Sequence, residues 1–382
     1  MEAPPWQLLP LDILIEIAVR SDDGATVIRC AATCKPLRRA ILDPAFRRRL
    51  EDIVAAKGGR IPALVMAASY LVRPNPIAPF TVRTSRPGLR FDTSILQTLQ
   101  PVCSRGGLLL LLRRDYTFDS VEFYVCDTLT GDVISVSSPD RWGTRSSYYR
   151  PALFTLDGAG RSFDLLVLAD PDLLPLPIGP LGLERYPLHQ IAPRSPPMTT
   201  EEESLTAPVV IGRTVHWLCN GGNRLGPDEN TDYENIIIIA LHADTAQATV
   251  TKLPTEIRIT GTMNPFRILI LAATGDGRLS VVAAGALAIT MWTLSPEENT
   301  WGRQLVIDRQ LTPGLVPYRA VRFQWFGERT GTVLVVVDQV GLVQIDLGTK
   351  EATVLHGSRG IVSAACLHEI DVVSLLQRME PF

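Results

Sequence analysis

The sequence predicts an α+β multidomain protein: a small N-terminal module of three helices, followed by a large, mostly antiparallel all-β domain of the propeller type. Three observations lead to this fold class. Apolar residues recur at helical spacing within the first fifty residues. From about residue 80 the chain becomes a series of short apolar runs separated by turns. Similar runs recur at an interval near fifty residues, which is typical of propeller blades.

The composition favours a globular protein and argues against binding of nucleic acid or a membrane. The chain has 382 residues, of which 46% are apolar and 20% charged, and this balance favours a large buried core. A net charge of −3 gives no electrostatic case for binding nucleic acid or a membrane surface. The longest uncharged apolar stretch, residues 279–295, is shorter than the ~20 residues of a membrane-spanning helix, so no span is expected.

The N-terminal module, residues 5–50, reads as three short helices. Pro10 and Asp12 suit the first turn of the first helix, and residues 21–24 are turn residues that close it. A second amphipathic run covers residues 25–34, and a third helix covers 37–42. Asp43 and Pro44 are expected to stop the third helix, leaving 45–50 as a short basic turn.

The module resembles an F-box. The likeness covers residues 6–50 and depends on the order Leu-Pro, Arg-Cys, Cys-Lys and Asp-Pro-x-Phe rather than on any single match. The matching positions are Leu9, Pro10, Asp12, Leu14, Ile17, Val27, Ile28, Arg29, Cys30, Cys34, Lys35, Arg38, Asp43, Pro44, Ala45 and Phe46. Many F-boxes have a tryptophan two residues after the lysine, where this chain has Leu37.

This resemblance implies that the module docks the Skp-type adaptor of a cullin–RING ubiquitin ligase. With helical spacing, it points to seven adaptor-facing residues: Leu9, Pro10, Ile13, Ile17, Cys30, Cys34 and Leu37. The alternative is an ordinary helical cap on the β domain, because three helices of this size bury little apolar surface alone.

Residues 51–79 are predicted to be a linker. Residues 51–57 continue as helix, 61–70 fit either a helix or a strand, and Pro74, Pro76 and Pro79 mark the domain boundary. The β domain is therefore expected to span residues 80–382.

Two markers repeat along the β domain. Polar turns start near 244, 295 and 346, 51 residues apart each time, and each lies between two strand-like runs. A glycine stands before or at the start of an apolar run at 107, 212, 277 and 331. The period is in the range of kelch-type propeller blades.

Two irregular regions interrupt this pattern. Residues 170–207 are rich in proline and read as a long loop inserted in the β domain. At the other end, 362–367 is a strand and 372–379 an amphipathic tail. Because the last blade of a propeller often closes with a strand from the other end of the domain, we expect 77–83 to pair with it.

Further likeness comes from the motif at 213–217 and from the spacing of Trp292 and Trp301. These features resemble the F-box-associated β domains of plant F-box proteins, and the nearest likeness is to the large set in grasses. Six late aromatic residues belong in blade packing, with one or two as possible binding anchors: Trp292, Trp301, Tyr318, Phe323, Trp325 and Phe326.

The sequence carries no pattern for bond chemistry. It lacks the Ser-nucleophile, zinc-protease and phosphate-loop motifs, and His216 is expected to be a core or edge residue. The six cysteines form no C-x-x-C pair, and no signal peptide is evident, so reduced thiols in the cytoplasm or nucleus are expected. No metal or cofactor site is expected.

The leading hypothesis is therefore a non-catalytic substrate receptor of a Skp–cullin–F-box ubiquitin ligase. The module would bind the adaptor and the β domain an unknown protein target, with neither nucleic acid nor membrane as a partner. Two alternatives are an F-box interaction scaffold outside any ligase and an enzyme on a propeller fold.

Overall fold

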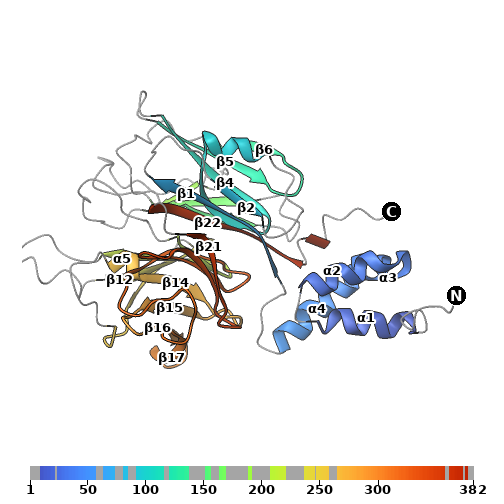
Figure 1. The fold of residues 1–382 in the computed structure, drawn as a ribbon. Coiled ribbons are helices and arrows are strands. Elements are labelled where there is room, and N and C mark those ends of the chain that lie inside the picture. The colour runs from blue at the N-terminus through green and yellow to red at the C-terminus, as the bar shows by residue number, and fades with distance from the viewer. Residues whose placement is uncertain are drawn as a thin grey trace, which may run out of the picture.

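The structure is a computed structural model. It describes residues 9–21, 24–56, 63–73, 81–84, 92–115, 120–136, 151–155, 163–168, 188–191, 207–220, 236–245, 247–257, 265–357, 361–372 and 375–376. In these ranges a bundle of short helices stands beside a large β body, and the C-terminal strand runs from the β body toward the helices (Figure 1).

Four helices form the N-terminal module in the described residues, where the sequence predicted three. They are α1 (Leu11–Val19), α2 (Gly24–Thr33), α3 (Lys35–Leu42) and α4 (Pro44–Ala56). The basic turn expected at 45–50 is the first half of α4, so that prediction was wrong. Asp43 caps α4, because its side chain accepts a hydrogen bond from the Ala45 N–H. Pro44 is the first residue of α4, a position where proline is favoured, so it begins this helix as well as ending α3.

The β body contains two three-stranded sheets in the described ranges. The first has the order β2-β1-β22, with β2 Thr81–Thr84, β1 Ala63–Arg73 and β22 Ile361–Asp371. The second has the order β7-β8-β9, with β7 Ala152–Thr155, β8 Phe163–Leu168 and β9 Leu188–Ile191.

Four further sheets have four antiparallel strands each, in chain order. The first contains β3 Gln100–Arg105, β4 Leu108–Asp115, β5 Ser120–Asp127 and β6 Val133–Val136, and the second contains β10 Val209–Ile211, β11 Thr214–Asn220, β12 Ile236–His242 and β13 Ala248–Lys252. The third contains β14 Leu269–Ala273, β15 Leu279–Ala284, β16 Ala288–Ser295 and β17 Thr300–Asp308. The fourth contains β18 Val321–Phe326, β19 Thr332–Val337, β20 Gly341–Asp346 and β21 Ala352–Gly357. Two short helices, η2 Thr93–Gln97 and α5 Pro265–Ile268, precede β3 and β14.

The sheets form a ring. One edge strand of each sheet contacts an edge strand of the next, in the order β3, β7, β10, β14, β18, β22 and back to β3. Meandering four-stranded sheets joined in this way are the blades of a β-propeller. The predicted mostly antiparallel, propeller-like β domain with N-terminal helices is therefore confirmed.

Both predicted sequence markers fall at equivalent turns of the four-stranded sheets. Gly107, Gly212, Gly277 and Gly331 lie in the turns between first and second strands and all have positive φ, which glycine adopts without a steric penalty. The polar turns join third to fourth strands. Asp127 and Asp346 illustrate their chemistry, since each side chain accepts hydrogen bonds from two backbone N–H groups of its own turn.

The ring is closed by strands from both ends of the chain. β22 pairs antiparallel with β1 from Ala63↔Asp371 to Arg73↔Ile361. Of the partner expected from the sequence, 77–83, the structure describes residues 81–83, which lie in β2 and pair with the other edge of β1. The β body thus begins at β1, inside the stretch expected to be linker, because the largely apolar residues 63–73 form the middle strand of a sheet.

Two other expectations are answered in part. The Pro-rich insertion contains a strand, β9, which pairs in parallel with β8; most of 170–207 lies outside the described residues. In the tail, Val372 and Leu376 are buried against the helices. No helix in the described parts of the chain is long and apolar enough to cross a membrane.

Candidate partner-binding site

Helix α1 presents an apolar face that nothing in the described residues covers. Ile13 and Ile17 are 47% and 49% exposed, and Leu9, Pro10 and Leu11 are also exposed. Positions 10, 13 and 17 share one side of the helix, because residues three and four apart are neighbours. The sequence-predicted residues of the first helix therefore do lie together at the surface.

The opposite side of α1 packs into the module. Ala18 and Val19 are buried, and Leu14 and Ile15 pack against the same cluster. On the rim, Glu16 accepts hydrogen bonds from Arg20 and from Arg49 of α4, and these bonds lower the pKa of Glu16. Because its opposite side is packed into the module and Glu16 bonds to α4, helix α1 keeps its exposed face in one orientation.

The remaining predicted contact residues lie elsewhere. Leu37 is buried in the core of the module, and Cys30 and Cys34 are half-buried against that core. Partial burial raises the pKa of the Cys30 thiol. Helical spacing alone did not separate the side of α2 and α3 that packs inward from the side that faces out. The apolar face is therefore a property of α1.

The core of the module includes residues from the end of β22 and beyond. Val372 and Leu376 join Val27, Leu37 and Leu50 in one apolar cluster. A Cβ on the first residue of α2, Gly24, would lie 2.6 Å from a Val372 methyl group, so only glycine permits this approach. A second small cluster joins α2 to the β1–β22 sheet. The module is thus fixed to the ring.

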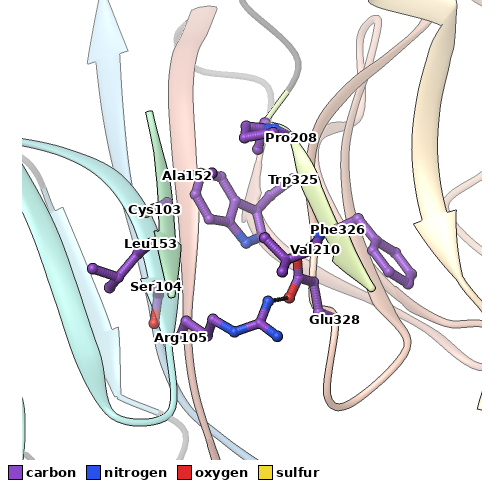
Figure 2. A pocket seen from close by; sticks show the side chains of 11 residues that line it. Cys103, Ser104, Arg105, Ala152, Leu153, Pro208, Val210, Trp325, Phe326 and Glu328 are labelled. Atoms are coloured by element: carbon purple, nitrogen blue, oxygen red, sulfur yellow. Dashed lines mark hydrogen bonds and ion pairs between the residues drawn. The ribbon is translucent and has the colours of Figure 1, made fainter. Parts of the chain in front are cut away.

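A small hollow lies where the edge strands of the ring meet. Its volume is about 330 Å³, including the open space at its mouth, and its walls come from β3, β7, β10 and the region around β18. Figure 2 shows the side chains of Arg105 and Glu328 reaching toward each other across it. The hollow therefore marks the place where side chains from several edge strands meet and close the centre of the ring.

The Arg105–Glu328 ion pair joins three sheets. Glu328, just after β18, pairs with Arg105 at the end of β3 and also accepts the Val210 N–H of β10 at 2.7 Å. Both charged side chains are mostly buried. Burial lowers the pKa of Arg105, and the Glu328 carboxylate opposes that shift. A buried pair of this kind needs both members.

A second buried carboxylate extends this cluster. Glu369 of β22 accepts the backbone N–H groups of Arg329 and Thr330 at 2.8 and 3.1 Å. Burial nevertheless raises the pKa of Glu369. With Arg105, Glu328 and Arg329 close by, we name Arg105, Glu328, Arg329 and Glu369 the central ionic cluster. It ties the β22 sheet to the β18–β21 sheet.

Among the described residues that line the hollow, the structure shows no activated nucleophile. Burial raises the pKa of the Cys103 thiol to about 12, so the thiol stays protonated at neutral pH. His216, expected to be a core or edge residue, lies in β11, and burial lowers its pKa to about 4. Sequence reasoning missed the central ionic cluster, since no local signal marks a pair separated by 223 positions.

The fold is that of a propeller-like protein with N-terminal helices, one of which exposes an apolar face. A family model described as domain of unknown function (DUF7595) matches residues 69–382, most of the chain. The chain therefore belongs to this family. The match begins within β1 and leaves the four helices outside it. No curated protein matches the sequence.

Several solved structures resemble the chain weakly. The apo AtxE2 isopeptidase is 11% identical with a TM-score of 0.28, covering 78% of this chain and 53% of that one. A protein from Lactobacillus plantarum is 10% identical with a TM-score of 0.32, covering 80% of this chain and 100% of that one. A Mycobacterium tuberculosis puromycin-hydrolyzing peptidase is 13% identical with a TM-score of 0.30, covering 80% and 54%. This chain thus spans about half the length of both peptidases.

Proposed function

We propose that this protein is a substrate receptor of a Skp–cullin–F-box ubiquitin ligase. The F-box resemblance of residues 6–50 suggests a Skp-type adaptor as the partner of the helical module. The propeller-like ring would then hold a protein target. In this role the chain performs no bond chemistry and raises the effective concentration of a target lysine near the conjugating enzyme.

The exposed face of α1 is the observation that carries the proposal. A helix that turns Ile13 and Ile17 outward, while its other side is packed, has apolar surface available for a partner. The residues on this face are those that the F-box resemblance assigns to adaptor contact: Leu9, Pro10, Ile13 and Ile17. Cys30, Cys34 and Leu37 support that face from inside the module and are not part of the proposed contact.

Co-purification of the full chain with a Skp-type adaptor tests the proposal. The double variant Ile13→Asp/Ile17→Asp should lose the adaptor, because it would bury two carboxylates in an apolar interface. Its melting temperature should stay near that of the wild type, since both side chains are about half exposed in the free protein.

The matched control is Ile134→Asp, a change at a similarly exposed isoleucine of β6, which should still bind the adaptor. Failure of the well-folded wild type to bind would overturn the proposal, as would normal binding by the double variant. Adaptor recovered without any cullin would instead support a scaffold outside the ligase.

A further inference from the structure

Exposed apolar side chains gather at one rim of the ring, far along the chain from α1. Leu311 and Tyr318 are 82% and 75% exposed, and Val316 between them is also exposed. All three belong to the connection between β17 and β18, residues 309–320. Leu287, in the turn between β15 and β16, lies against the same connection because its carbonyl accepts the Arg309 N–H at 2.9 Å.

Arg309 holds this connection in place from inside. Its buried guanidinium donates to four carbonyls: those of Gly285 and Ala286 in the β15–β16 turn and those of Val316 and Arg319 in the connection itself. Leu315 is fully buried and anchors the segment in the apolar core. The exposed side chains thus stand on a fixed backbone, which reduces the entropy lost on binding a partner.

Tyr318 adopts a backbone conformation that costs free energy. Its φ is +59°, a left-handed geometry in which a residue as bulky as tyrosine is a genuine outlier. The Tyr318 N–H donates to Ala286 at 2.9 Å, and this bond belongs to the backbone and not to the ring. Since the ring is mostly exposed, its own contacts do not offset the strain, and backbone hydrogen bonds of the connection hold the conformation instead. Such strain is characteristic of functional positions.

The neighbouring charge indicates what a partner would carry. Arg319 is exposed, and its side chain has no carboxylate partner among the described residues. Arg322, by contrast, lies 3.8 Å from Asp338, and Arg309 is occupied by carbonyls. A partner with apolar side chains for the rim and a carboxylate for Arg319 would satisfy both features. Tyrosine and arginine are also, with tryptophan, the side chains enriched among the residues that dominate binding energy.

We infer that this rim surface, formed by Leu287, Leu311, Val316, Tyr318 and Arg319, binds a segment of a target protein in which apolar residues stand next to an acidic residue. Tyr318 and Leu311 anchor the apolar side chains, and Arg319 pairs with the carboxylate. As recognition of a ubiquitination target the inference rests on the proposed function. The binding itself needs no adaptor.

Fluorescence anisotropy with the purified full chain and three sets of short labelled peptides tests the inference. One set joins leucine or isoleucine to aspartate, the second replaces the aspartate with lysine, and the third keeps the aspartate and replaces the apolar residues with serine. The wild type should prefer the first set by about tenfold or more. Arg319→Glu should reverse the preference between the first and second sets.

Tyr318→Asn is the sharpest variant. Asparagine tolerates positive φ, so the change should leave the melting temperature unchanged or raise it, while binding of the first set falls about tenfold or more. Val250→Ser on β13, another exposed apolar position, should bind normally. Equal binding of all three sets, or full binding by Tyr318→Asn, would overturn the inference. Neither result bears on adaptor docking, which is measured separately on α1.

Discussion

The helical module and the centre of the ring are both closed by residues far apart in the sequence, but with opposite chemistry. The module core is apolar and takes Val372 and Leu376 from the tail. The ring is tied at its centre by the buried Glu369 and by the mostly buried Arg105 and Glu328, and all three are hydrogen-bonded. Apolar packing can adjust to a changed side chain, whereas removing one partner of a buried ion pair is strongly destabilising, because the other charge is left uncompensated. The two regions should therefore respond differently to single substitutions.

Removing one charge from the ring centre should have the largest effect. Glu328→Gln removes the carboxylate that pairs with the mostly buried Arg105 and should lower the free energy of unfolding by about 3–5 kcal/mol, measured by urea denaturation. The exposed pair Arg113–Glu122 is the control: Glu122→Gln should cost less than about 1 kcal/mol.

A double substitution sharpens this prediction. Arg105→Met/Glu328→Gln removes both charges together, keeps an amide oxygen for the Val210 N–H, and should be far less destabilising than Glu328→Gln alone. If the double variant were the less stable of the two, the ion pair would be a net source of stability and our account of the ring centre would fail.

The corresponding change in the module should cost somewhat less. Leu376→Ala leaves a cavity in the apolar core and should destabilise the module by about 3 kcal/mol, seen as earlier loss of helical circular dichroism on heating. Adaptor binding should weaken with it. Leu311→Ala, at a mostly exposed position, should change stability by less than about 0.5 kcal/mol. Equal effects of the two changes would contradict docking of the tail.

Acid should destabilise the ring through His368, whereas residues 9–56 contain no histidine. His368 Nε2 lies 2.9 Å from Ser69 Oγ between β22 and β1, and burial lowers its pKa to about 4. Below about pH 6.5 the histidine of the unfolded chain binds a proton, whereas the buried His368 of the native state stays neutral until the pH nears 4. The free energy of unfolding therefore falls as the pH drops from 6.5 toward 4.

By pH 5 this loss should reach about 2 kcal/mol. His368→Gln should flatten the curve of unfolding free energy against pH, compared with the wild type. Some slope should remain, because the pKa of His216 is also about 4. Parallel curves for the variant and the wild type would contradict the assignment.

Local patterns in the sequence predicted much of the fold. The four-stranded sheets contain the features that the sequence predicted: the period near fifty residues, the turn glycines such as Gly212 and the polar turns such as that at Asp346. These features depend on residues close together in the chain. The outward direction of Ile13 and Ile17 was likewise accessible, because helical spacing and the F-box resemblance agreed on it.

Long-range features were not accessible. The pairing of β1 with β22, the burial of Leu376 among the helices and the bond from Arg105 to Glu328 all join positions hundreds of residues apart. Tyr318 belonged to a set of aromatic residues expected mostly in blade packing. Trp292, Phe323, Trp325 and Phe326 are indeed buried, and only the tertiary structure singles out Tyr318 as exposed.

The tail within the module also has a consequence for protein synthesis. The helices leave the ribosome before the tail does, and Val372 and Leu376, which complete their core, are translated hundreds of residues later. We expect nascent or prematurely terminated chains to carry an incomplete module. If the module docks an adaptor, only a chain translated through the tail would offer a firm docking face, so docking would report that translation had passed residue 376.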